Sequence, residues 1–168
     1  MYYIIGVNGN TDISKRSYTY AEFRAATELS KKEADRWVQA GVIQAGPADG
    51  HRREYFFDSI FEGIIAKQLA DFSSRELLPK TMEALRSCLK RDGIRPASIE
   101  ENPGGPRLRV QVYSRRSQEV MLGGGVRGVI SYVKRYDPAS TDIGKSVYVV
   151  VDLTLVALET RTAIGHLS

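Results

Sequence analysis

The sequence predicts an α+β protein in which a mostly helical N-terminal part precedes a β-rich C-terminal domain. Two helix-start signals within residues 18–40, followed by a turn-rich segment, indicate the N-terminal arrangement. Apolar residues that alternate with polar ones between Arg107 and Val112 indicate strands in the C-terminal part. With 168 residues, of which 42% are hydrophobic, the chain can form one domain or two small ones with a packed core.

Two short helices are expected in succession. Thr19 precedes Glu22 by three residues and Ser30 precedes Glu33 by three, the spacing at which a hydroxyl and a carboxylate cap a helix start reciprocally. We expect helices over 20–27 and 31–40, the second ended by Gly41. The inward residues expected from helical spacing are Phe23, Ala26, Ala34, Trp37 and Val38. So short a connection between two helices is typical of a helix-turn-helix, whose second helix enters the DNA major groove.

A β-hairpin is expected directly after the second helix. The turn-rich segment 44–50 leads into 51–57, which begins with basic residues and ends with aromatic ones. A hairpin in this position makes the unit a winged helix-turn-helix. A further helix, with apolar residues at helical spacing, follows Asp58 and is expected to close the core.

Residues 18–72 resemble the MerR-type DNA-binding domain. The resemblance depends on the exit Gly41-Val42-Ile43, on Arg53 with Tyr55 in the wing, and on Asp58 before the next helix. Two positions depart from the family pattern: Arg36-Trp37 replaces the usual Arg-Tyr, and 50–53 only approximates the wing's Gly-Tyr-Arg. The resemblance implies that the second helix and the wing contact double-stranded DNA.

The DNA-contacting residues are predicted from the polar face of the second helix and from the wing. They are Lys31, Lys32, Asp35, Arg36, Gln39, Arg52, Arg53 and Tyr55. Arg36 and Gln39 are expected to read bases, and the two lysines to contact phosphates. The net charge of the whole chain is +4, although residues 1–72 hold slightly more acidic than basic residues. The alternative interpretation of the basic clusters is an ordinary solvated surface.

A further helix and a domain boundary are expected beyond residue 72. The capping signal at 73–76 precedes a helix of about four turns whose apolar stripe could pair with a second copy: Leu78, Met82, Leu85 and Leu89. Pro79 marks either the helix start or a kink. The predicted divisions are an N-terminal strand or arm (1–17), the winged unit with its following helices (18–94), a linker (95–106), and a β-rich domain (107–168) for self-association or partner binding. Within the last, residues 147–165 fit either a strand or a helix.

Several other classes of chemistry lack their signatures. His51, His166 and Cys88 are too few and too scattered for a usual metal site, and Cys88 is expected to be packed in a core or an interface. The glycine-rich segment 123–128 lacks the Gly-Lys-Ser/Thr of a phosphate loop and is expected to be a hairpin turn. No nucleophile–base pair is recognisable. We therefore expect no enzyme, no metal and no cofactor.

The sequence favours a sequence-specific DNA-binding transcriptional regulator of bacterial or phage type. One recognition helix reads few base pairs, so we expect a homodimer, paired mainly through the C-terminal part. The lack of a long apolar run and of a charged leader, with only one cysteine, predicts a cytoplasmic protein. Two alternatives remain: a DNA-bending factor of the excisionase kind, or an antitoxin or adaptor that binds a protein partner through its C-terminal part.

Overall fold

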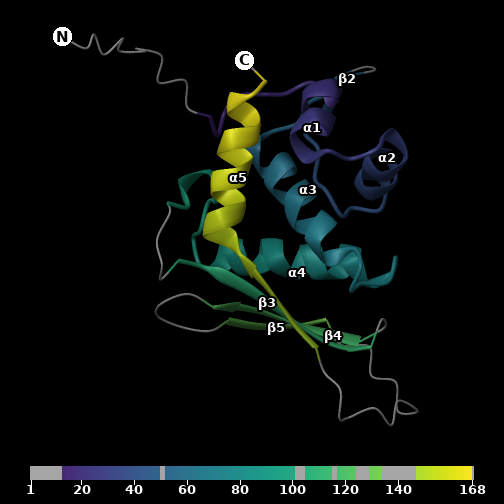
Figure 1. Ribbon diagram of the computed structural model, residues 1–168, viewed down its shortest axis with the longest axis vertical. Helices are drawn as coiled ribbons and strands as arrows, with labels where there is room; N and C mark the ends of the chain where they lie inside the picture. Colours follow the sequence, from purple (N-terminus) through teal and green to yellow (C-terminus); the bar gives the residue numbers. More distant parts are fainter. Residues whose placement is uncertain are drawn as a thin grey trace, which may run out of the picture.

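The computed structural model describes residues 13–49, 52–100, 105–114, 117–123, 129–133 and 147–167. The α-helices are α1 (Tyr20–Thr27), α2 (Lys31–Gln39), α3 (Phe57–Leu69), α4 (Leu77–Arg91) and α5 (Leu153–Gly165), with a short 3-10 helix η1 (Pro96–Ser98) (Figure 1). The strands are β1 (Ala48–Asp49), β2 (Arg52–Arg53), β3 (Arg107–Ser114), β4 (Ser117–Gly123), β5 (Val129–Val133) and β6 (Val147–Asp152). Most of the predicted N-terminal strand or arm, residues 1–12, lies outside the described residues.

Reciprocal capping starts both helices of the N-terminal pair, as predicted. The Thr19 backbone N–H donates to the Glu22 carboxylate at 2.7 Å, and the Glu22 N–H donates to the Thr19 hydroxyl at 3.2 Å. Ser30 and Glu33 repeat this arrangement at the start of α2. These hydrogen bonds also lower the pKa of both carboxyls, since they favour the charged form.

The C-terminal ends of α1 and α2 are each followed by a residue in the left-handed backbone conformation. Gly41, just after α2, has φ +73°, which a residue without a side chain adopts at little cost. At the end of α1 the same role falls to Glu28, with φ +53°, although an L side chain disfavours this conformation. The Glu28 carboxylate accepts from the Lys67 ammonium on α3 at 2.7 Å, which ties the turn to the third helix.

The hairpin predicted after α2 is present. Ala48 pairs with Arg53 and Asp49 with Arg52 in antiparallel register. Beyond it, Tyr55 forms a two-way backbone bridge with Tyr18, at 2.7 and 3.1 Å. The bridge joins the exit of the hairpin to the segment that enters α1.

Helix α3 is the centre of the fold. Phe57, Phe61, Ile65 and Leu69 are completely buried, and α1, α4, α5 and η1 all pack around this helix. At Gly63 the approach of α1 is so close that an added Cβ would lie 2.7 Å from the Thr27 methyl. The expected core role of α3 is confirmed.

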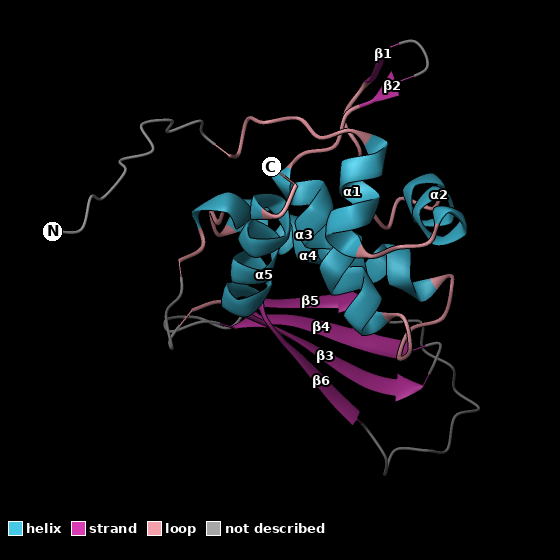
Figure 2. Ribbon diagram, turned by 45° about the horizontal axis from the view of Figure 1, so that its top comes forward, coloured by secondary structure: helices cyan, strands magenta, loops and turns pink. Residues whose placement is uncertain are grey.

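Helix α4 begins near Pro79, as one of the two alternatives predicted, and packs over the larger sheet (Figure 2). Its apolar stripe is buried inside its own chain: Leu78, Met82, Leu85 and Leu89. The expectation that this stripe could pair with a second copy is wrong, because the larger sheet and α3 already cover it. Cys88 on the same face is buried and free, which confirms its packing role.

Four strands form an antiparallel sheet in the order β5-β4-β3-β6, with the helices gathered on one of its faces (Figure 2). Leu108 pairs with Leu122 on one side and with Val151 on the other. The ambiguous run after Val147 divides at Asp152, which ends β6 and caps α5 by accepting from the Thr154 N–H at 3.0 Å. The predicted turn at 124–128 lies outside the described residues.

The predicted fold class, with a β-rich C-terminal domain after the winged unit, is wrong. Helices hold most of the residues in regular structure, and the last of them, α5, packs against α1 and α3 at the N-terminal end of the chain. Leu153, Val156 and Ile164 of α5 share one hydrophobic core with Phe23 and Phe61. The C-terminal segment thus completes the core around α1 and α3 instead of forming its own.

None of the helices in the described ranges is long and apolar enough to cross a membrane. The expected linker contains η1, and Ile99 after it is buried. Arg161 of α5 holds this segment, because its guanidinium donates to the Ala97 carbonyl at 3.0 Å and also to that of Ile99.

Candidate nucleic-acid interface

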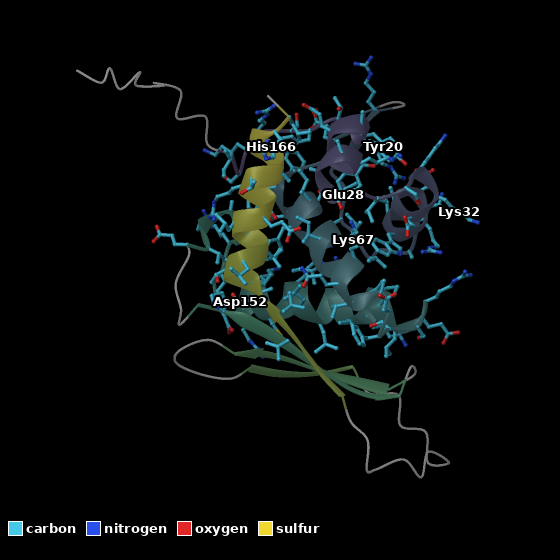
Figure 3. The ribbon with its side chains drawn as sticks, in the orientation of Figure 1. Tyr20, Glu28, Lys32, Lys67, Asp152 and His166 are labelled. Atoms are coloured by element: carbon cyan, nitrogen blue, oxygen red, sulfur yellow. The ribbon has the colours of Figure 1, made fainter. Side chains whose placement is uncertain are left out.

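Helix α2 presents two chemically different faces. Ala34 is fully buried and Trp37 nearly so, against the core, as predicted. Lys31, Lys32 and Gln39 are exposed, and Figure 3 shows Lys32 extending away from the rest of the protein. Arg36 is half-buried at the border of the two faces. The polar residues predicted from helical spacing therefore lie together on the outer side of α2.

Asp35 is held by a neighbouring helix. Its carboxylate accepts from the Tyr20 hydroxyl at 2.6 Å, and the same hydroxyl lies 3.3 Å from the Lys31 carbonyl. Burial, followed by the hydrogen bond to Asp35, raises the pKa of Tyr20 to about 12. The phenol thus remains protonated and fixes the start of α2 relative to α1, an arrangement that the sequence does not reveal.

The hairpin contributes two exposed cations. Arg52 and Arg53 are adjacent on β2, and both are exposed. Tyr55, predicted as a DNA contact, is instead buried, with its ring stacked on Phe23 at 4.4 Å between centroids. Burial raises the pKa of its phenol. Its assignment to the DNA-contacting surface is therefore corrected: the side chain packs the wing onto α1.

An ion pair between α3 and α4 holds the backbone that connects α2 to the hairpin. The Arg86 guanidinium of α4 donates to the Gly41 carbonyl at 2.7 Å and to the Val42 carbonyl at 3.3 Å. The Glu62 carboxylate of α3 lies 3.2 Å from Arg86 and accepts from the Gln44 N–H at 2.7 Å. Neither role is recognisable in the sequence, because charged side chains inside apolar helices carry no local sign of their partners.

Ser59 completes the support of the same connection. Its hydroxyl donates to the Gln44 carbonyl at 2.6 Å and accepts from the Phe56 N–H at 3.2 Å. The Gln44 carbonyl before the hairpin and the Phe56 N–H after it are thus both hydrogen-bonded to Ser59 of α3. The wing and α2 are positioned by α3 and α4 rather than by the turn sequence alone.

A second cation, Arg75, accompanies Arg36. A cavity of about 140 Å3 between α2 and the start of α4 is lined by Arg36 and Arg75 together with Trp37 and Leu78. Arg75 is exposed. In the sequence, Arg75 is only part of a helix-start signal, and nothing there relates it to α2.

The described residues contain no group of three or more His, Cys, Asp or Glu side chains arranged to hold a metal ion. His166 lies exposed at the end of α5, and His51 is outside the described residues. Comparison of the chain with models of known protein families and with curated proteins finds no match.

Proposed function

We propose that this protein is a sequence-specific double-stranded DNA-binding regulator of bacterial or phage type that acts in the cytoplasm. The observation that carries the proposal is the two-faced α2: Ala34 and Trp37 anchor it in the core, while Lys31, Lys32 and Gln39 extend outward. Such a helix can enter a major groove without exposing its apolar side. The order of helix pair, hairpin and closing helix supports the resemblance to the MerR-type domain.

The roles of the individual residues follow from their exposure and partners. Arg36 and Gln39 are assigned to base edges, and Lys31 and Lys32 to phosphates. Arg52 and Arg53 of the hairpin are assigned to the backbone of an adjacent groove, with Arg75 as a further phosphate contact. Asp35 keeps its hydrogen bond to Tyr20 and positions α2.

Site selection requires more than one α2 helix, so we propose that a homodimer binds two half-sites. The α4 stripe is unavailable for pairing, because its residues are buried within one chain. Exposed apolar side chains on the C-terminal elements, such as Val150 on β6, remain available for it.

A gel-shift scan of the full chain against DNA from around its own gene tests the proposal. We expect one fragment to be bound at least about a thousandfold more tightly than bulk DNA, the lower end of the usual specificity ratio. The Lys90→Ala variant, which removes an exposed cation at the far end of α4, should bind normally. Equal affinity for every fragment, or no binding at all, would remove the regulator assignment.

A further inference from the structure

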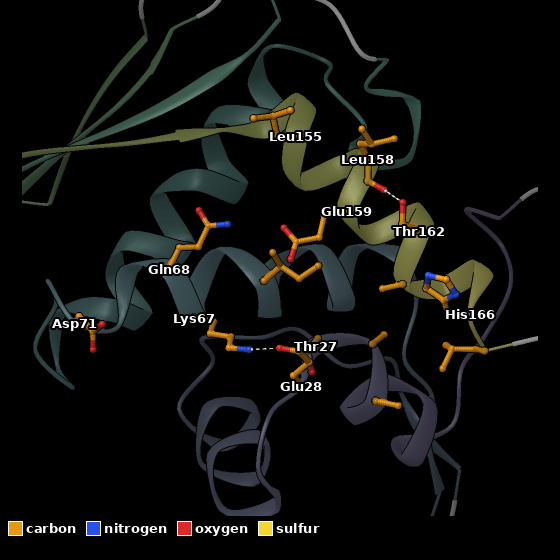
Figure 4. Close-up of a pocket in the computed structure, with 15 residues that line it drawn as sticks. Thr27, Glu28, Lys67, Gln68, Asp71, Leu155, Leu158, Glu159, Thr162 and His166 are labelled. Atoms are coloured by element: carbon orange, nitrogen blue, oxygen red, sulfur yellow. Dashed lines mark hydrogen bonds and ion pairs between the residues drawn. The ribbon is translucent and has the colours of Figure 1, made fainter.

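A groove of about 920 Å3 lies between α5 on one side and α1 and α3 on the other (Figure 4). It is open to solvent along one side. Ala25, Ala26 and Ile64 contribute apolar surface from α1 and α3. None of the exposed α2 or hairpin residues assigned to DNA lines it, so the groove is separate from the proposed DNA-contacting surface.

Two leucines on α5 are exposed at this groove. Leu155 is 57% exposed and Leu158 39% exposed, and they lie three residues apart, on neighbouring turns of the same helix. Large apolar side chains grouped on a surface with a polar border are typical of interaction sites. The folded chain leaves both leucines without a covering segment among the described residues.

The groove is also acidic. Glu28 and Lys67 form an ion pair at 2.7 Å, so their charges balance, and Figure 4 shows this pair on the wall opposite α5. Asp71 and Glu159 line the groove as well, and neither has an ion-pair partner within the described ranges. A binding partner would therefore meet an uncompensated negative charge at each of two places beside the apolar surface.

The dimensions of the groove suit a helix. Within α5 the groove-lining residues extend from Leu155 to Ala163, which corresponds to about 12 Å at 1.5 Å per residue, or a little over two helical turns. His166 and Leu167 continue this wall just after the helix. An amphipathic helix binds such a surface through apolar residues at positions i, i+3 or i+4, and i+7. We propose that the groove binds a basic amphipathic helix of a partner protein, with leucine-like side chains against Leu155 and Leu158 and cations beside Asp71 and Glu159.

Charge and shape favour this occupant over the alternatives. A second copy placed groove to groove would bring the same carboxylates together across a two-fold axis, which costs energy through like-charge repulsion. A small molecule would keep much of its surface in water, because the groove is open, whereas small-molecule sites usually enclose most of the ligand. The inference does not depend on DNA binding.

Two synthetic helical peptides of about four turns test the proposal against the full chain. Both carry leucines along one face; the first has lysines beside them, and the second has glutamates in the same positions. Fluorescence anisotropy should show the lysine peptide binding at least about tenfold more tightly, with an affinity that decreases as salt rises. Equal affinities for the two peptides would overturn the basic character of the partner.

Matched variants locate the binding. Leu158→Glu should weaken binding of the lysine peptide about tenfold or more, whereas Ala21→Glu, at an exposed residue of α1 that does not line the groove, should not. Glu159→Lys should shift the preference toward the glutamate peptide. All three sites are exposed, and thermal melts will verify that each variant folds.

Two results would contradict the assignment. If Leu158→Glu and Ala21→Glu weaken binding equally, the peptide binds elsewhere. If light scattering shows self-association that Leu158→Glu abolishes, a second copy occupies the groove and the proposal fails. Loss of DNA binding in the gel-shift scan with retained peptide binding would remove only the regulator assignment.

Discussion

The Arg86 guanidinium of α4 lies 3.2 Å from the Glu62 carboxylate of α3, and both groups bind the backbone that joins α2 to the hairpin. The Glu62 side chain is 7% exposed and that of Arg86 19%. This pair therefore links the helix that packs on the sheet to the elements proposed to contact DNA.

Replacing Arg86 by Met should lower the free energy of unfolding by about 3–5 kcal/mol, because it leaves the Glu62 charge buried without its partner. Urea denaturation measures this. The matched control is Arg91→Met, since that arginine is exposed on the same helix, and its effect should remain within about 0.5 kcal/mol. A loss below about 1 kcal/mol in Arg86→Met would show that water screens the pair.

The same substitution should alter the dependence of stability on pH. Burial raises the pKa of Glu62, and Arg86 opposes that rise. Because the folded pKa exceeds the unfolded value, the stabilisation associated with protonated Glu62 is complete below the unfolded pKa and is lost as pH rises through the folded pKa. Removing Arg86 should raise the folded pKa further, so the decline should extend to higher pH. Denaturation midpoints measured from pH 4 upward test this, and a profile parallel to wild type would contradict it.

Ser30→Ala should lower the free energy of unfolding by about 1 kcal/mol, because it removes the hydroxyl that caps α2. The pKa of Glu33, lowered mainly by hydrogen bonds from Ser30, should return toward its ordinary value. A lowered carboxyl pKa contributes stability above the unfolded pKa that is lost as pH falls, so the variant should lose less stability in acid. Ser87→Ala, at an exposed position inside α4, is the control and should be nearly neutral.

Arg36→Ala and Trp37→Ala, at adjacent positions, should affect different properties: DNA affinity in the first and folding stability in the second. The first should weaken specific DNA binding by about 1–3 kcal/mol with little change in stability, as for loss of a base contact. The second should reduce folding stability by about 3–5 kcal/mol, because the indole is buried. Gel shifts and chemical denaturation distinguish them. Equal loss on specific and random DNA would make Arg36 a phosphate contact.

Replacing Arg52 and Arg53 together by Ala should reduce the slope of log affinity against log salt by up to about two, since each phosphate contact releases nearly one counterion. Titrations at several salt concentrations measure the slope. An unchanged slope would indicate that the hairpin lies away from DNA.

A fragment that ends at Glu101 should fail to unfold cooperatively. It lacks α5, and each buried side chain of that helix contributes about 1.5–3 kcal/mol when it is removed from water. Leu153, Val156 and Ile164 are among them. Circular dichroism during heating tests this, with a fragment ending at Gly165 as the control. A sharp transition in the shorter fragment would show that the N-terminal helices fold independently.

The start and end of the first two helices were predictable from local sequence. The reciprocal pairs Thr19–Glu22 and Ser30–Glu33 act within one helical turn, and Gly41 supplies the backbone conformation at the end of α2. The inward position of Trp37 also follows from helical spacing. In each case the interacting residues lie within a few positions of one another in the sequence, so no distant partner is needed to predict the structure.

Only the tertiary structure decided the partners of these elements. The apolar residues after Asp152 fit a strand or a helix, and they became α5 because α1 and α3 offer it a surface for burial. Tyr55 matched a wing residue in sequence, yet the ring of Phe23 covers it. The raised pKa of Glu62 depends on its burial beside Arg86, and residues far away in the chain create that burial. Periodicity identifies the apolar face of an element, but the geometry of the whole chain determines what covers that face.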